Sequence, residues 1–221
     1  MKEFKELNAL SAIREVNFNY ALSPMSDPRA KRIITKIHSM IEIGISQFSL
    51  FYDDIKVTLD KGTAERQAAT ANELLDFLKK KIPRPILYFC PTQYRGFKKT
   101  QYLETLTKEL NKSVKIFWTG PKVISKRIDL SHLNKINELL KRPPLLWDNI
   151  FANDYLPGII LRFPYRYRAP QIVKKTHGIL INPMNQYRAS KPLIYTVAEF
   201  IKAPFEYIPR KAWKQAMHDI N

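Results

Sequence analysis

The residues best suited to do chemistry are two adjacent carboxylates, Asp53 and Asp54, which end the apolar stretch in SLFYDDIKV (49–57). Two carboxylates held close together cannot both ionise cheaply, so one keeps its proton to higher pH and can act as an acid near neutrality. Neighbouring residues of a regular strand point to opposite faces, but both can face the same way where the chain leaves the strand. The pair therefore suits general acid–base catalysis, and a helix N-cap or a surface turn is the alternative interpretation.

A second group of polar residues follows another apolar run, in the segment WDNIFANDY (147–155). It combines aromatic rings at both ends with two carboxylates and two amides. This mixture is typical of sugar sites, because flat rings cover the apolar faces of a sugar while Asp and Asn side chains bind its hydroxyl groups. A polar loop built from turn-forming Asn and Asp is the alternative interpretation.

Other kinds of catalytic site find little support in the sequence. The histidines (His38, His132, His177 and His218) lack metal-ligand spacing, and the sequence has no GxSxG, HExxH, GxGxxG or GxxxxGK[ST] motif. The single cysteine, Cys90, lies in the apolar run ILYFC and is expected to be a buried, inert thiol. We therefore expect neither a metal nor an organic cofactor.

Composition and charge set broad limits on the kind of protein. The chain has 221 residues, 45% of them hydrophobic and 26% charged, which indicates a folded globular protein. No apolar run is long enough for a membrane span or a signal peptide, and with one cysteine this predicts a cytoplasmic location. The net charge of +17 attracts polyanions, but the lysines are dispersed, so a nucleic-acid partner is not favoured.

The elements that must position these residues alternate along the chain. Six short apolar runs have the near-continuous character of strands buried on both faces: 18–22, 47–52, 86–90, 114–118, 145–150 and 178–182. Segments with helical periodicity are found before, between and after them: 1–16, 27–44, 62–82, 99–111, 129–142, 191–203 and 209–221. In 27–44 Asp27 is the expected N-cap with Pro28 at the first helical position, and the helix in 62–82 is expected to open on Thr63.

This alternation predicts an α/β protein with a parallel sheet and helical crossovers. A doubly wound sheet of six strands and a (β/α)8 barrel lacking two strand–helix units are both possible. The polar residues collect at the ends of the runs, which favours the barrel because its strands all open on one mouth. A doubly wound nucleotide site would instead need a Gly-rich turn, and the chain has only six glycines.

Five motifs, taken in order, resemble the catalytic domain of the family 84 glycoside hydrolases, the protein O-GlcNAcases and related, hyaluronidase-like β-N-acetylglucosaminidases. They are FYDDI, FCPTQYRG, WTGPKVISK, LLWDNIFANDYLP and GILINPMNQYRASK, and the resemblance runs from about residue 13 to the C-terminus. It implies a (β/α)8 TIM barrel and a retaining, substrate-assisted hydrolysis in which the 2-acetamido oxygen of the substrate forms an oxazoline. Such enzymes are exceptions to the ordinary two-carboxylate scheme.

The resemblance also implies roles for single residues. Asp53 would accept the acetamido N–H, and Asp54 would protonate the leaving oxygen and then deprotonate water. The implied substrate-binding residues are Tyr94 at the acetamido or oxazoline group, Trp147 at the methyl pocket, Asn149 beside the acetamido group, Asp154 at O4 and O6, Asn182 at the outer hydroxyls, and Tyr155 at the mouth of the site.

The chain also departs from the family pattern. Its first alignable motif, NFNYALSP, resembles the third strand of the family barrel, so the first two strand–helix units have no counterpart and the domain is expected to be N-terminally truncated. We expect residues 1–203 to form a partial barrel and 204–221 to begin a C-terminal helical extension. An oligomer or a second chain could complete the barrel.

The sequence thus predicts a β-N-acetylglucosaminidase that acts on an N-acetylglucosamine-bearing glycan or glycoprotein, with no metal and no membrane span. One alternative is a truncated, catalytically inactive glycan-binding or vestigial homologue. Another is a basic protein that binds nucleic acid.

Overall fold

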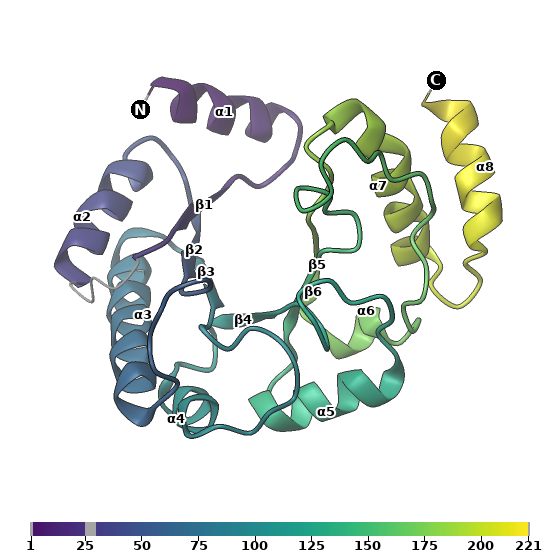
Figure 1. The fold of residues 1–221 in the computed structure, drawn as a ribbon. Coiled ribbons are helices and arrows are strands. Elements are labelled where there is room, and N and C mark those ends of the chain that lie inside the picture. The colour runs from purple at the N-terminus through teal and green to yellow at the C-terminus, as the bar shows by residue number, and fades with distance from the viewer. Residues whose placement is uncertain (1, 25–29, 221) are drawn as a thin grey trace. The chain divides into compact units, whose positions relative to one another are not determined.

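A computed structural model describes residues 2–24 and 30–220 of the chain. Strands and helices alternate, and the strand pairs within each part of the molecule are parallel. All six predicted strands are present, within a few residues of their expected bounds. The chain divides into two compact units (Figure 1), the first formed by Met1–Tyr94 and Lys99–Phe117, the second by Arg95–Lys98 and Trp118–Asn221.

The first unit is a parallel sheet with helices packed on it. Its elements are α1 (Lys2–Ile13), β1 (Asn19–Leu22), α2 (Ala30–Ile41), β2 (Gln47–Phe51), α3 (Lys61–Lys81), β3 (Ile86–Cys90), α4 (Gln101–Glu109) and β4 (Lys115–Trp118). The strands pair in the order of the sequence, β1 with β2, β2 with β3, and β3 with β4. The long helix α3 packs against both α2 and α4. The fully buried side chains, each stabilising the fold by about 1.5–3 kcal/mol, include Phe48 and Leu50 of β2, Leu87 and Phe89 of β3, and Leu74 and Leu78 of α3.

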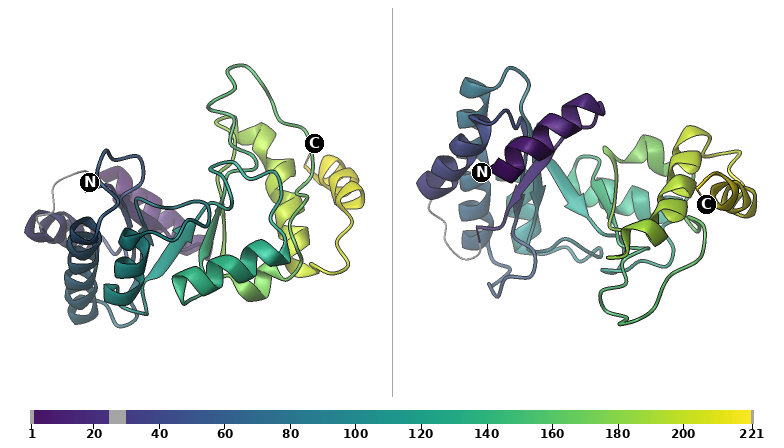
Figure 2. Two further views of the ribbon diagram at one scale, coloured as in Figure 1. Left: turned by 60° about the horizontal axis from the view of Figure 1, so that its bottom comes forward. Right: turned by 90° about the horizontal axis from the view of Figure 1, so that it is seen from above.

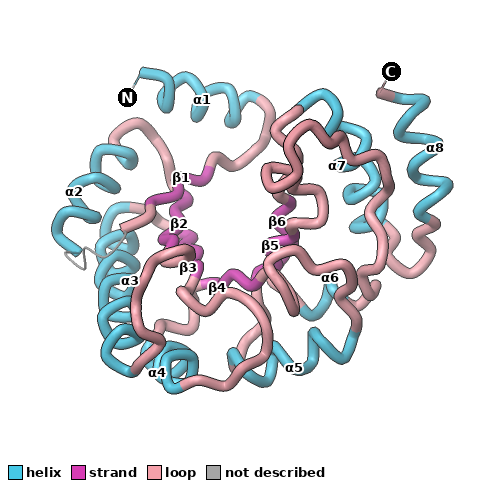
Figure 3. The backbone as a smooth tube through the Cα atoms, viewed as in Figure 1, coloured by secondary structure: helices cyan, strands magenta, loops and turns pink. Residues whose placement is uncertain are grey.

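The second unit is built around one parallel strand pair. Its elements are α5 (Leu130–Leu140), β5 (Leu145–Asp148), α6 (Ile172–Lys175), β6 (Gly178–Ile181), α7 (Tyr187–Lys202) and α8 (Pro209–Asp219). The register pairs Leu145 with Gly178 and Asp148 with Ile181, so β5 and β6 end together. Helix α8 packs along α7 (Figure 2). A long loop connects β5 to α6 (Figure 3), and it carries the second half of the motif WDNIFANDY.

Some helix boundaries differ from the sequence expectation. Helix α3 begins at Lys61, and its N-cap is Asp60, whose carboxylate accepts a hydrogen bond from the Thr63 backbone N–H; the expected start at Thr63 was wrong. The expected cap at Asp27 and Pro28 lies outside the described residues. Helix α7 starts before Lys191 and continues through Pro192, although proline removes one helical hydrogen bond. The four-residue helix α6 was not predicted.

Two further expectations concern burial and membranes. Cys90 is buried at the end of β3, as predicted, and burial raises the pKa of its thiol well above the ordinary range. None of the helices in residues 2–24 and 30–220 combines the length and the apolar character that a membrane crossing requires.

Candidate active site

The two adjacent carboxylates stand on a turn directly after β2. The strand buries Phe48, Ser49 and Leu50, and a hydrogen bond of 2.9 Å from the Tyr52 N–H to the Cys90 carbonyl extends the pairing by one residue. The chain then leaves the strand, and Asp54 adopts a left-handed backbone conformation with φ of 49°. Asp tolerates this region better than most residues. The turn leaves Asp53 half-buried and Asp54 exposed.

This difference in burial gives the two carboxylates different electrostatics. Burial raises the pKa of Asp53, a backbone hydrogen bond opposes this rise, and the neighbouring Asp54 charge adds to it. Asp54 instead faces solvent and accepts a hydrogen bond of 3.0 Å from the Tyr94 hydroxyl. The pair therefore combines one carboxylate of raised proton affinity with one that is open to solvent and held by a phenol.

Buried polar contacts hold the loop that carries Tyr94. After β3 the Thr92 backbone N–H donates to the Tyr102 hydroxyl at 3.0 Å, and the Thr92 hydroxyl accepts from the Gln67 amide at 2.9 Å. Tyr102 in turn donates to the Gln67 side-chain carbonyl. Gln67 on α3 and Tyr102 on α4 thus fix the start of this loop from two helices.

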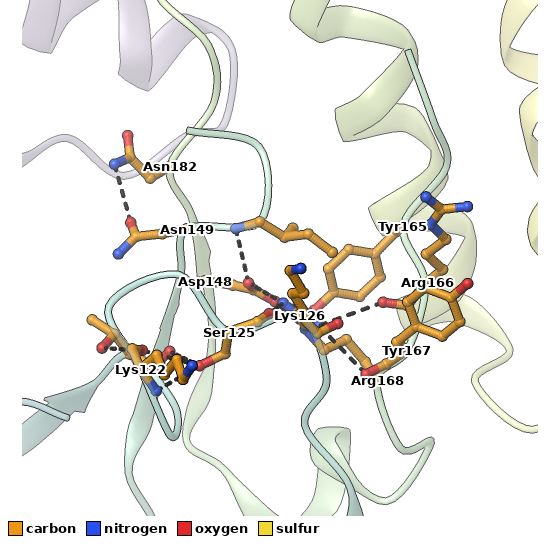
Figure 4. Close-up of polar contacts among 12 residues, drawn as sticks. Lys122, Ser125, Lys126, Asp148, Asn149, Tyr165, Arg166, Tyr167, Arg168 and Asn182 are labelled. Atoms are coloured by element: carbon orange, nitrogen blue, oxygen red, sulfur yellow. Dashed lines mark hydrogen bonds and ion pairs between the residues drawn. The ribbon is translucent and has the colours of Figure 1, made fainter. Parts of the chain in front are cut away.

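In the second unit the end of β5 separates its polar residues by strand periodicity. Successive side chains of a strand point to opposite faces, so Trp147 lies on the face opposite Asp148. Asn149, the next residue, donates from its amide to the Val123 carbonyl at 2.8 Å, and it accepts from the Asn182 amide at 3.1 Å (Figure 4). Asn182 follows β6, so this contact joins the ends of the two paired strands.

Asp148 enters a buried ion pair with Arg168 (Figure 4). Both side chains are 0% exposed, and the guanidinium holds the carboxylate through two hydrogen bonds of 2.6 and 2.7 Å. The Tyr165 hydroxyl donates to the same carboxylate at 2.8 Å, and Arg168 also donates to the Ser125 carbonyl at 2.8 Å. Burial lowers the pKa of Arg168, but its bonds to Asp148 more than offset this, so the pKa is raised. This aspartate therefore fixes Arg168 and Tyr165 in the interior of the unit, and its carboxylate does not reach solvent.

The last two predicted residues, Asp154 and Tyr155, are exposed on the loop that follows β5. The residue before them, Asn153, is buried and anchors this loop. Its amide donates to the Ile159 carbonyl at 2.7 Å and to the Gln186 side chain at 2.9 Å. Asp154 thus extends from a loop whose base is fixed while its own side chain is open to solvent.

Within each unit the structure brings some predicted residues into contact. In the first unit Tyr94 contacts Asp54, and in the second Asn182 contacts Asn149. Trp147 is half-buried, and Asp154 and Tyr155 are on their exposed loop. Sequence reasoning missed the residues that hold these side chains in place, namely Gln67, Tyr102, Asn153, Tyr165 and Arg168.

Across residues 2–24 and 30–220 no group of three or more His, Cys, Asp or Glu side chains is placed to hold a metal ion. The carboxylates described at the strand ends are Asp53 and Asp54, which are adjacent, and Asp148, which is bound by Arg168.

Comparison with known proteins gives the family. Residues 1–221 match the family model described as β-N-acetylglucosaminidase. The chain belongs to this family. The protein O-GlcNAcase of Rattus norvegicus is 32% identical over 218 residues, which are 89% of this chain and 24% of the relative. This β-N-acetylglucosaminidase family member therefore spans about a quarter of the length of that curated relative.

Solved structures agree with this assignment. An O-GlcNAc hydrolase variant from Thermobaculum terrenum is 32% identical with a TM-score of 0.90, covering 98% of this chain and 50% of the other. The structure of CpGH84B is 25% identical with a TM-score of 0.91, covering 98% and 41%. The predicted fold class, α/β of the TIM-barrel type with six parallel strands, is confirmed, and so is the predicted family. The proposed division at residue 203 and the proposed oligomer stay predictions.

Proposed function

We propose that this chain removes terminal β-linked N-acetylglucosamine from a glycan or glycoprotein by substrate-assisted, retaining hydrolysis. The observation that carries the proposal is the unequal pair Asp53 and Asp54 at the end of β2 in a member of the β-N-acetylglucosaminidase family. The similarity to a relative named protein O-GlcNAcase favours a glycoprotein substrate.

In the first step of the proposed reaction, the carbonyl oxygen of the 2-acetamido group attacks the anomeric carbon. The glycosidic bond breaks, Asp54 gives its proton to the leaving oxygen, and Asp53 accepts the acetamido N–H as positive charge develops on that group. An oxazoline results. The raised pKa of Asp53 suits this role, because a more basic carboxylate is a stronger acceptor for the N–H.

In the second step water attacks the anomeric carbon and the oxazoline opens. Asp54, now a carboxylate, takes the proton from the attacking water and is ready for the next cycle. The two displacements at one carbon give net retention of configuration. Exposure of Asp54 supports this role, since the residue must exchange protons with a leaving group and with water.

The remaining roles are proposed residue by residue. Tyr94, whose hydroxyl is within hydrogen-bond distance of Asp54, would hold the acetamido or oxazoline group. The proposed sugar-binding residues of the second unit are Trp147 and Asn149 for the acetamido group, Asp154 and Asn182 for the outer hydroxyls, and Tyr155 for the mouth of the site. The bonds that fix Asn149 to Val123 and to Asn182 support a positioning role for its amide.

The test is hydrolysis of a fluorogenic aryl β-N-acetylglucosaminide by the 221-residue chain and its variants. We expect Asp53→Asn to lower turnover by about 10²–10³-fold, as loss of a group that stabilises charge in the transition state does. Asp54→Asn should cost less on this substrate, because an aryl leaving group needs little protonation, and its loss should grow with poorer leaving groups. Asp76→Asn, an exposed carboxylate on α3 of the same unit, is the matched control and should leave turnover unchanged.

A substrate pair isolates the role of the acetamido group. The corresponding aryl β-glucoside has a hydroxyl in place of this group and should not be hydrolysed. Turnover of the glucoside, or equal losses in Asp53→Asn and Asp76→Asn, would contradict the proposal. A chain that unfolds cooperatively and binds N-acetylglucosamine without any turnover would identify a glycan-binding homologue instead.

A further inference from the structure

The second unit has a groove that no step of the proposed reaction uses. It is a cavity of about 450 Å³ whose walls come from the loop at 160–162, the first turns of α7, and the last half of α8. Helix α7 begins a few residues after the carboxyl end of β6, and α8 packs along it. The groove is therefore built at the same edge of this unit as Asn149 and Asn182.

The charged side chains that line the groove are all positive. Arg162, Arg188 and Lys191 line it, and among its described lining residues none is acidic. The ring of Tyr187 gathers two of these cations: its hydroxyl accepts from Arg188 at 3.1 Å, and Arg188 and Lys191 lie 5.9 and 5.7 Å from the ring centroid. Three exposed cations side by side repel one another, so an anionic occupant would relieve this repulsion.

The other lining residues are apolar. Pro192 is buried, Trp213 is half-buried, and Ile160 and Met217 are 37% and 39% exposed. A groove that combines exposed apolar side chains with a cationic rim suits a ligand that has both apolar and acidic groups. The aromatic rings at the groove are Trp213, which is half-buried, and Tyr187, whose ring already contacts two cations. Neither ring is a free platform on which successive bases could stack, so these walls favour a polypeptide over a nucleic acid.

The groove is preformed. The buried amide of Asn153 ties the two walls together, because it donates both to the Ile159 carbonyl and to Gln186, which immediately precedes α7. The Leu161 N–H is also bonded to the Met184 sulfur at 3.1 Å. Asn153 directly precedes Asp154, so the loop that presents Asp154 also forms one wall of the groove. A fixed wall lowers the entropic cost of binding an extended ligand.

We propose that this groove binds an acidic peptide segment of the glycoprotein substrate. Carboxylates of the peptide would pair with Arg162, Arg188 and Lys191, and an apolar side chain between them would contact Trp213 and Met217. The inference rests on the proposed function in one respect, that the peptide belongs to a glycosylated protein. The chain would then prefer glycosylation sites that have acidic and apolar residues nearby in the sequence.

Fluorescence anisotropy tests the groove without any sugar chemistry. The probe is a fluorescein-labelled peptide of sequence Glu-Leu-Glu-Leu-Glu, added to the 221-residue chain at low ionic strength. We expect Arg188→Glu and Lys191→Glu each to weaken binding by about tenfold or more, because each puts a like charge opposite the peptide. Lys211→Glu makes the same charge change on α8 at a residue that does not line the groove, and should change binding by less than about twofold.

Changes to the peptide test the apolar part of the groove without any risk to folding. Replacing both leucines by serine should weaken binding several-fold, and replacing the glutamates by glutamine should abolish it. Equal weakening by Arg188→Glu and Lys211→Glu would mean that net charge alone attracts the peptide, which would overturn the proposal. The proposal would also be overturned if a single-stranded oligonucleotide displaced the peptide and if Arg188→Glu weakened binding of the oligonucleotide more than Lys211→Glu did. Hydrolysis of the aryl substrate, which has no peptide, tests the proposed reaction separately.

Discussion

Two strands of this molecule have aspartates at or just beyond their carboxyl ends, and the surroundings of these carboxylates differ. After β2, Asp53 and Asp54 lie side by side on a turn, with no cation holding either in the described contacts and with one phenol hydrogen bond to Asp54. At the end of β5, the buried Asp148 is enclosed by Arg168, Tyr165 and a backbone N–H. The comparison shows that the partners of a carboxylate near a strand end decide whether it is open to solvent or enclosed.

Removing the cation from the enclosed carboxylate should have the largest effect on the free energy of unfolding. Arg168→Met leaves Asp148 buried and unpaired, so we expect a loss of about 3–5 kcal/mol, measured by urea denaturation. Arg166→Met is the matched control, since this exposed neighbour only stacks on Phe163 and Tyr167 and should cost about 1 kcal/mol or less. Similar losses in both variants would show that Asp148 is not anchored as described.

Removing the Tyr94 hydroxyl that contacts Asp54 should lower turnover and leave the free energy of unfolding nearly unchanged. Tyr94→Phe deletes the hydroxyl that contacts Asp54, and we expect turnover of the aryl substrate to fall about tenfold, which is about 1.4 kcal/mol in the activation free energy. Tyr195→Phe deletes a hydroxyl that makes an equally long bond of 3.0 Å to the exposed Asp219, and turnover should not change. If Tyr94→Phe lowered the melting temperature by as much as Arg168→Met, the contrast between the two strand ends would fail.

The smallest expected effect is a pH-dependent change in melting temperature when Asp53 is replaced. The pKa of Asp53 is raised in the folded chain above its ordinary value of 3.8, so ionising this residue destabilises the fold. Asp53→Asn removes that cost and should raise the melting temperature at pH 7 by a few degrees. The gain should shrink as the pH falls and vanish below 3.8, where the native carboxyl is protonated in both states.

Asp60, in the same unit, has a pKa shifted in the opposite direction from that of Asp53. Hydrogen bonding to Thr63 lowers the pKa of Asp60, so its stabilising contribution is present above the ordinary pKa and is lost as the pH falls. Asp60→Asn should therefore lower the melting temperature slightly at pH 7 and have no effect at low pH. Thermal melts of both variants across pH check the two signs together, and a destabilised Asp53→Asn at pH 7 would contradict the account of the pair.

The sequence predicted the strands well because each is a short, nearly continuous apolar run, which is the pattern of a parallel strand buried on both faces. It also predicted that polar residues would gather at strand ends, as Tyr94 and Asp54 do although they lie 40 positions apart. It did not predict the partner of Asp148, because Arg168 lies 20 positions away and nothing local marks one arginine among many as buried. The N-cap Asp60 was missed for a different reason, since Thr63, three residues later, is also of a residue type that caps helices. The individual sugar-binding roles came from the resemblance to the family and not from the residues themselves.

The alternation along β5 also restricts how this protein can change over evolutionary time. Trp147 and Asp148 point to opposite faces of the strand, and Asn149 follows at once. One inserted or deleted residue within the strand would exchange the faces, so that the carboxylate that anchors Arg168 and the indole that is proposed to contact substrate would each point the wrong way. Length variation in descendants of this chain should therefore be rare in β5, because it would separate Asp148 from Tyr165 and Arg168.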